Sequence, residues 1–221
     1  MPELWDAASG SIRDLPEYTS GARTTTVPLK LEAFESAFII FRKSIQKKDE
    51  KSSDVNFPEL KAITEITDPW IVTFDSASRG PHRPVIFNKL SDWTLNSNDS
   101  IRYYSGTALY KSGFILGKLH PDGNLYLDIG PVSGMARVKI NGNDAGGLWT
   151  YPWRVDISTL VKEGENRIEV EIVNTWVNRL IGDSKLPVNK RRTWCFVNPF
   201  NPESQLAASG MIGPVQIFYA E

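Results

Sequence analysis

Cysteine is almost absent from this sequence of 221 residues, and the one copy, Cys195, rules out an internal disulfide. There is also no apolar run of about eighteen residues, the length that a membrane-spanning helix needs, so no membrane partner is expected. The formal net charge is −1 and the isoelectric point is about 6.2, which leaves no basic footprint for nucleic acid. The N-terminal residues lack the basic region and apolar core of a signal peptide.

Helical periodicity is nearly missing as well, and an alternation of apolar and polar residues takes its place. Residues 126–129, 136–140 and 167–173 each place apolar side chains on one face of the chain and polar ones on the other. This period of two is typical of antiparallel strands that pack on a core. Asn141 and Gly142, directly after the second of these strands, supply the left-handed backbone of a tight hairpin. The pattern predicts an all-β sandwich.

Composition divides the chain into three parts. Residues 1–43 form a strand-rich arm, residues 44–60 are poor in apolar side chains and indicate a linker or long loop, and residues 61–221 hold most of the predicted strands. The few short strands of the arm cannot bury a core by themselves. They must dock on the sandwich, pair with another chain or expose apolar edges, and we predict a homodimer through the arm.

A set of short motifs follows the predicted strands of the third part. The motifs are a strand that ends in V-x-x-N-G, a Gly-Gly turn, aromatic residues, a D-I-S step and a G-E-N turn. With these motifs the segment resembles the galactose-binding-like jelly roll that is attached to large glycoside hydrolases. The matching residues are 138–142, Gly146 with Gly147, Trp149 with Trp153, 156–158 and 164–166.

Four longer stretches narrow the resemblance. They are YSGTA at 104–108, WTYPWRVD at 149–156, NTWVNRLIGD at 174–183 and SGMIGPV at 209–215. With them nearly the whole chain is similar to the C-terminal part of the α-L-rhamnosidase-like enzymes of glycoside hydrolase family 106. The resemblance implies a jelly-roll module whose catalytic barrel lies upstream in a larger enzyme. Such enzymes are expected in the periplasm or outside the cell.

Patterns that indicate catalysis are missing. Glycoside hydrolysis ordinarily uses two carboxyl groups about 5–10 Å apart across a cleft, and the acidic residues here mostly fall in turns or on solvated strand faces. Asp156 fits the D-I-S turn, whereas Asp183 is harder to assign. His82 and His120 lack the spacing of metal ligands, and the apolar flank of Cys195 predicts a buried, inert thiol. We assign no catalytic residue and no metal ligand, and a stand-alone hydrolase is the least favoured interpretation.

A sugar site needs an aromatic face for the C–H side of the ring and planar polar groups for its hydroxyls, presented where strands end. Two segments supply this set, the first at residues 149–154 and the second at residues 176–183. Both are expected to leave the sheet as loops, and loops of this fold can meet at one end of the sandwich. The opposite interpretation is that the tryptophans fill the core while the polar residues hold loops together. The predicted carbohydrate-binding residues are Trp149, Arg154, Trp176, Asn178, Arg179 and Asp183.

The predicted function is that of a non-catalytic module that binds or helps to present rhamnose-containing glycans. Its expected partners are carbohydrate or an upstream catalytic domain. The alternative is a purely structural domain that braces a catalytic barrel. No cofactor is predicted, but modules of this resemblance often hold a structural calcium ion, for which Asp75, Asn141 and Asp144 are candidates.

Overall fold

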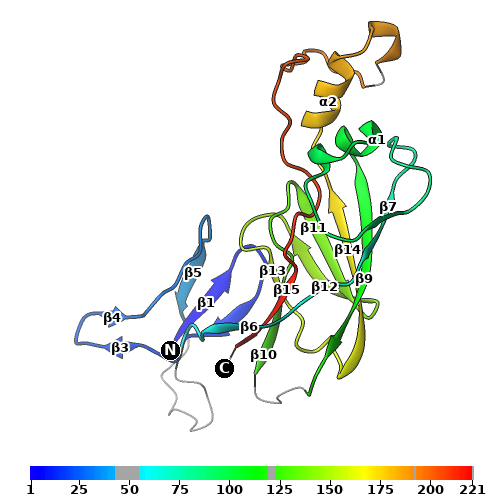
Figure 1. The fold of residues 1–221 in the computed structure, drawn as a ribbon. Coiled ribbons are helices and arrows are strands. Elements are labelled where there is room, and N and C mark those ends of the chain that lie inside the picture. The colour runs from blue at the N-terminus through cyan, green and yellow to red at the C-terminus, as the bar shows by residue number, and fades with distance from the viewer. Residues whose placement is uncertain (43–54, 119–122, 192, 221) are drawn as a thin grey trace.

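Two antiparallel sheets form the body of the protein, which is described by a computed structural model over residues 1–42, 55–118, 123–191 and 193–220. The strands of the larger sheet are β7 (Trp70–Phe74), β8 (Val85–Phe87), β9 (Thr107–Leu116), β11 (Met135–Ile140), β12 (Asn143–Leu148) and β14 (Gly164–Val173). Those of the smaller sheet are β6 (Leu60–Glu65), β10 (Asn124–Asp128), β13 (Arg154–Asp156) and β15 (Gln216–Ala220). Their orders are β12-β11-β14-β9-β7-β8 and β13-β10-β15-β6 (Figure 1).

The core lies between these sheets because the long strands alternate as the sequence predicts. In β11 and β14 the buried residues stand at every second position, and Val138, Val170 and Ile172 have no exposed surface. Trp93 and Tyr110 add stacked aromatic rings whose centroids lie 6.2 Å apart. The prediction of an all-β sandwich is confirmed.

The hairpin between β11 and β12 differs in one respect from the prediction. Asn141 and Gly142 adopt positive φ angles of 53° and 85°, as its tight turn requires. The residues that follow were expected to form only a Gly-rich turn, yet they form β12, the edge strand of the larger sheet. The pairing of β11 with β12 shifts its register between Val138 and Lys139, and Gly146, which pairs with Val138, has a φ of 121°. Glycine is tolerated in a strand at such an irregularity.

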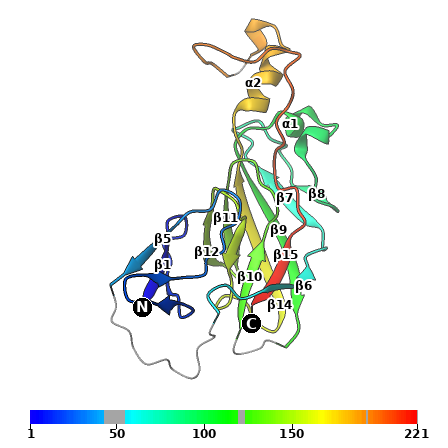
Figure 2. The same cartoon turned by 90° about the vertical axis from the view of Figure 1, so that its left-hand side faces the viewer.

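The arm is a small sheet that docks beside the sandwich (Figures 1 and 2). Its contact with the sandwich includes Asn56, which is 1% exposed and stands just before β6. The Asn56 Nδ2 atom donates to the Glu17 carbonyl (2.7 Å), and the Glu17 N–H donates back to Asn56 Oδ1 (2.9 Å). The arm strands are β1 (Pro2–Asp6), β2 (Ile12–Asp14) and β5 (Ala37–Phe41) in the order β2-β1-β5, with a short pair β3 (Thr19–Ser20) and β4 (Thr25–Thr26).

Docking leaves part of the arm's apolar surface uncovered. Phe34, Phe38 and Phe41 are 91%, 62% and 59% exposed, and β5 is an edge strand of its sheet. The homodimer through this surface stays a prediction. So do the domain boundaries at residues 43 and 60, because residues 43–54 of the expected linker lie outside the described residues.

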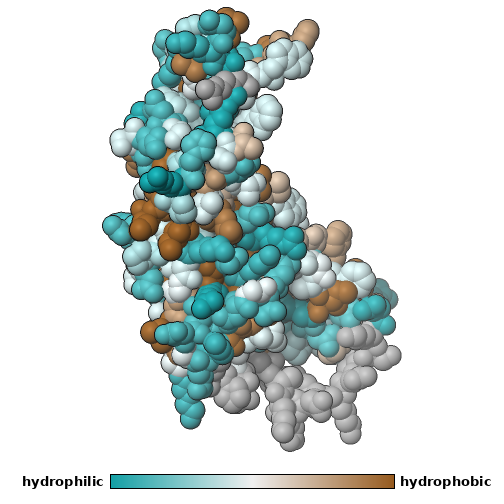
Figure 3. Space-filling view, turned by 90° about the vertical axis from the view of Figure 1, so that its right-hand side faces the viewer, coloured by the Kyte–Doolittle hydropathy of each residue, from teal (hydrophilic) through white to brown (hydrophobic). Residues whose placement is uncertain are grey.

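Helical structure gathers at one end of the sandwich, where Figure 1 shows α2 above the sheets. Beyond α2 the chain runs outward as residues 185–191 and 193–200, which we call the projection. Hydrophobic side chains are visible at the surface of the molecule in Figure 3. In the described part of the chain no helix is long and apolar enough to cross a membrane. The helices are η1 (Trp93–Leu95), α1 (Asp99–Arg102), α2 (Val177–Ser184) and η2 (Val188–Lys190).

The projection corrects the prediction made for the cysteine. Cys195 is half-buried, and its neighbours Trp194 and Phe196 are 82% and 90% exposed. The apolar flank therefore faces outward, because the projection leaves the sandwich and has no second layer of the described chain to pack against. The expected buried thiol is wrong.

Candidate functional site

The two segments predicted to form one sugar site leave the larger sheet at the same end. Leu148, the last residue of β12, pairs through Ala136 with Ile172 near the end of β14. Beyond this shared end the segments diverge. The first crosses to β13 in the smaller sheet, and the second enters α2. Trp149 and Arg154 line an open groove, whereas the four predicted residues of the second segment are not among its described lining residues.

The second segment is a helix and not the expected loop. Its buried positions are Asn178, Ile181 and Asp183. Asn178 and Ile181, three residues apart, share one side of α2, whereas Asp183 lies on the opposite side near the end of the helix. Asn178 exchanges two hydrogen bonds with Ala207, from Nδ2 to the carbonyl (2.7 Å) and from the Ala207 N–H to Oδ1 (2.8 Å). Asp183 accepts hydrogen bonds from both the backbone N–H and the hydroxyl of Thr193. These two polar side chains hold the later part of the chain against the helix.

The remaining two residues of this segment differ in exposure. Trp176 stands at the start of α2 and is 59% exposed, so the interpretation that it fills the core is wrong. Arg179 donates from Nη2 to the Ser78 carbonyl (3.2 Å) and thereby links α2 to the turn after β7. Gly182 lies so close to Tyr103 that an added Cβ would stand 2.7 Å from its ring, which shows how tightly the helix packs.

The first segment provides the side chains that face solvent. Trp149 and Tyr151 are 61% and 40% exposed. Arg154 was expected in a loop, but it begins β13, where it pairs with Asp128 of β10. Its guanidinium forms an ion pair with the Asp128 carboxylate (3.1 Å) and lies over the Phe218 ring. The strand pairing explains this position, because it fixes the side chain beside an acid on the neighbouring strand.

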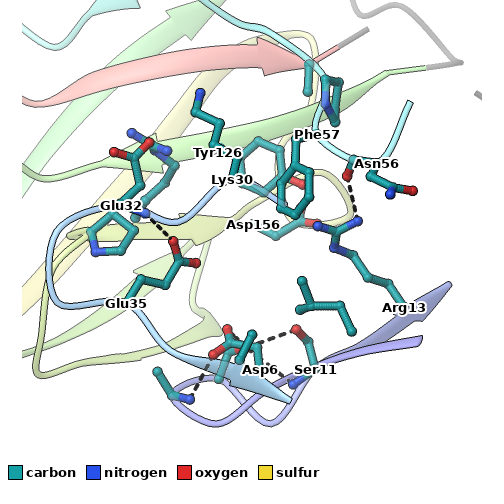
Figure 4. Close-up of a pocket in the computed structure, with 18 of the residues that line it drawn as sticks. Asp6, Ser11, Arg13, Lys30, Glu32, Glu35, Asn56, Phe57, Tyr126 and Asp156 are labelled. Atoms are coloured by element: carbon teal, nitrogen blue, oxygen red, sulfur yellow. Dashed lines mark hydrogen bonds between the residues drawn. The ribbon is translucent and has the colours of Figure 1, made fainter. Parts of the chain in front are cut away.

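An open groove of about 2070 Å³ lies between the arm and the sandwich. Figure 4 shows Glu32 and Glu35 entering it from the arm, opposite Tyr126 and Asp156 of the sandwich. Trp149 and Tyr151 also belong to its lining. The groove therefore joins exposed aromatic faces with hydrogen-bonding side chains from two parts of the fold.

One wall of the groove is built around Arg13. Its Nη1 atom donates to the Asn56 carbonyl (2.7 Å), and its guanidinium lies 4.8 Å from the centre of the Phe57 ring. Burial lowers the pKa of Arg13, against the opposing effect of nearby Tyr126 and Glu35. Burial also raises the pKa of the Tyr126 phenol, and the Asp156 carboxylate adds to this increase.

Sequence reasoning missed most of this groove. The residues of its arm side come from the first sixty positions, and no local motif connects them with the segment after β12. Such a juxtaposition arises only when the arm docks. The missed lining residues that carry polar or aromatic groups include Arg13, Glu17, Glu32, Glu35, Phe57 and Tyr126.

The calcium candidates do not fit a metal site. Asp75 accepts hydrogen bonds from the Ala77 N–H and the Ser78 hydroxyl, and Asp144 forms a two-bond ion pair with Arg137. Asn141 lies at the opposite end of the larger sheet from Asp75. Among the described residues, no three acidic, histidine or cysteine side chains group as metal ligands. His120 lies outside the described residues.

Comparison with known proteins places this arrangement in context. No family model matches the sequence. The structure resembles part of a rhamnosidase from Novosphingobium sp. PP1Y, with a TM-score of 0.89 and 30% identity over 99% of this chain and 20% of that chain. A Formosa agariphila protein named "Putative beta-glucuronidase" is 38% identical in an alignment of 158 positions that covers 60% of this chain and 14% of that protein.

A more distant structure shares the fold alone. Ruminococcus gnavus beta-glucuronidase matches 75% of this chain and 31% of its own, with a TM-score of 0.52 and 21% identity. The chain spans at most a fifth of the rhamnosidase and the Formosa protein. Together these findings relate it to glycoside hydrolases.

Proposed function

We propose that this chain is a non-catalytic, carbohydrate-binding module of an α-L-rhamnosidase-like glycoside hydrolase of the family 106 type, with a galactose-binding-like jelly roll as its body. It helps to bind and present rhamnose-containing glycans. The proposal is supported by the resemblance to part of a rhamnosidase over 99% of the chain. Two acidic residues that could have served in hydrolysis, Asp156 and Asp183, instead form hydrogen bonds that hold a turn and a chain segment in place. Their structural roles also support the proposal.

The groove carries the proposal. Trp149 and Tyr151 offer ring faces to a sugar, and both are exposed before any ligand arrives. Arg13 and Asp156 stand in the same groove with donors and acceptors that can fix hydroxyl groups. Because the walls come from the arm and the sandwich, the groove can hold several sugar units along its length. This combination of aromatic and planar polar groups is typical of carbohydrate sites.

The test is a titration of the chain with rhamnose-containing oligosaccharides, in which binding is measured by calorimetry and by tryptophan fluorescence. We expect saturable binding with a dissociation constant in the range of about 10 μM to 1 mM. Trp149→Ala should weaken it at least tenfold, since stacking area is lost. Trp176→Ala is the matched control, because Trp176 is equally exposed but lies outside the groove. Equal losses in both variants, or no binding at all, would overturn the proposal.

A second function is favoured by the projection. Trp194, Phe196 and Val197 are 82%, 90% and 70% exposed on a segment that extends beyond the sandwich. A domain that braces a catalytic barrel needs such apolar contacts on a protruding element. In this alternative the chain holds the barrel in place and the groove binds no sugar.

The proposal that the chain braces a catalytic barrel is tested in the longer enzyme that the resemblance implies. The double variant Trp194→Ser, Phe196→Ser should lower the melting temperature of that enzyme while leaving that of the isolated chain unchanged. Leu95→Ser, which removes another highly exposed side chain away from the projection, provides the control. If the double variant changes both melting temperatures equally, the projection does not dock on the barrel.

A further inference from the structure

The groove carries far more acidic than basic side chains. Its lining includes three basic residues, Arg13, Lys30 and Arg154. Six carboxylates line it as well, and they come from both the arm and the sandwich: Asp6, Asp14, Glu17, Glu32, Glu35 and Asp156.

The basic groups are also less available than their number suggests. Arg154 is paired with Asp128, whose carboxylate is not among the lining residues, so its charge is already matched. The guanidinium of Arg13 is held between the Asn56 carbonyl and the Phe57 ring, and Glu35 is close enough to affect its pKa. Lys30 is exposed. An anion inside the groove would therefore meet more carboxylates than available basic side chains.

Carboxylates stand on both walls of the groove. Figure 4 shows Glu32 and Glu35 on the arm side and Asp156 on the sandwich side, with Tyr126 beside them. The Glu35 Oε2 atom accepts the Glu32 N–H (2.7 Å), which fixes the loop that presents both carboxylates. Burial is the main cause of the raised pKa of Tyr126, and the Asp156 carboxylate adds to the increase, whereas Arg13 and Arg154 act against it.

We propose that the groove selects uncharged, hydroxyl-rich sugar chains and rejects chains that carry uronate or sulfate groups. This inference rests on the proposed function and specifies its ligand. Ionised carboxylates only accept hydrogen bonds, so they bind sugar hydroxyls, which donate. They repel anionic sugars, and this repulsion acts over about 8 Å, the Debye length at physiological ionic strength.

A matched pair of ligands tests the charge selection. One is a rhamnogalacturonan oligosaccharide, and the other is the same oligosaccharide after reduction of its uronate carboxyls to primary alcohols. We expect the reduced form to bind at least tenfold more tightly to the wild-type chain, a difference of about 1.4 kcal/mol. The difference in affinity between the two oligosaccharides should decrease when the ionic strength is raised from about 0.01 M to about 1 M, because the Debye length then falls from about 30 Å to about 3 Å.

Two variants connect the effect with the groove. The double variant Glu32→Gln, Glu35→Gln keeps the size of both side chains and a side-chain oxygen for the Glu32 N–H. It should bring the affinity for the uronate form close to that for the reduced form. Glu171→Gln, on the exposed face of β14 and outside the groove, should leave the difference as it is.

The outcomes separate the two proposals. Equal or tighter wild-type binding of the uronate form would overturn the charge selection while the sugar-binding function stands. A preference that persists unchanged in the double glutamine variant would overturn it as well. If neither form binds, the proposed function itself fails, and the charge selection fails with it.

Discussion

The Asn178 side chain and the Ala207 backbone exchange two hydrogen bonds. The side-chain amide thus pairs with a residue after the projection in the way that a neighbouring strand would. The bonds run from Asn178 Nδ2 to the Ala207 carbonyl (2.7 Å) and from the Ala207 N–H to Oδ1 (2.8 Å). Asn178 is 2% exposed. The planar amide that suggested sugar recognition in the sequence is thus engaged inside the protein.

We therefore predict that Asn178→Ala destabilises the protein without removing sugar binding in the groove. The loss leaves the partly buried N–H and carbonyl of Ala207 without these partners, at a cost of about 1–3 kcal/mol. Urea unfolding should show a lower midpoint of the transition. Asn189→Ala, on the exposed η2, should leave that midpoint unchanged. An unchanged stability of Asn178→Ala would contradict the assigned role.

Asp183 is expected to anchor the projection. Its carboxylate accepts two hydrogen bonds from Thr193, and hydrogen bonds to a charged acceptor contribute about 1.5–3 kcal/mol. Asp183→Asn should therefore raise the hydrogen-exchange rate of the Thr193 amide by about tenfold or more. The control is Asp144→Asn, which removes an exposed ion pair in the β11–β12 hairpin and should not affect Thr193. Equal exchange in wild type and Asp183→Asn would show that the projection is held by other contacts.

The body of the fold was predictable because its signal is local. Strands β11 and β14 alternate with a period of two, and Asn141 with Gly142 marks the turn. Helix α2 was missed because its eight residues form little more than two turns, and two of its three buried residues, Asn178 and Asp183, are polar. Buried polar residues hide the apolar period of a helix, and here their partners lie at Ala207 and Thr193.

The candidate site was predictable only in part, and for a different physical reason. Trp149 follows two glycines at a strand end, which is a local signal of exposure, and its side chain is exposed. Its neighbours in the groove, Arg13 and Glu35, are more than one hundred residues away in the sequence. Their meeting depends on how the arm docks around Asn56, and no spacing within either segment encodes it.

The exposed face of the arm leads to the prediction of a homodimer. Phe38 and Phe41 are exposed on β5, an edge strand whose free side can pair with a second copy. Sedimentation velocity at micromolar concentration should give the mass of a dimer, and Phe38→Asp should convert it to a monomer by placing a charge in the interface. Phe196→Asp tests whether any exposed aromatic has this effect, and we expect the dimer to persist. A monomeric wild-type chain would end the prediction.

Two buried tyrosines, Tyr104 and Tyr110, and the half-buried Tyr126 predict a loss of stability at high pH. Burial raises the pKa of Tyr104, Tyr110 and Tyr126 in the folded protein, whereas in the unfolded chain these phenols ionise near a pH of about 10. The folded state thus favours the protonated form. Its contribution to stability is complete below a pH of about 10 and decreases as the pH rises from there toward the folded-state pKa values.

Spectrophotometric titration of phenolate absorbance measures this directly. With seven tyrosines in the chain, we expect the folded protein to titrate in an early and a late phase, and the urea-unfolded protein in a single phase. The free energy of unfolding should stay level up to a pH of about 10 and fall above it. Tyr110→Phe should reduce the late phase, because the Tyr110 hydroxyl is buried and accepts the Met211 N–H (3.2 Å). A single phase in the folded protein would contradict the burial of these phenols.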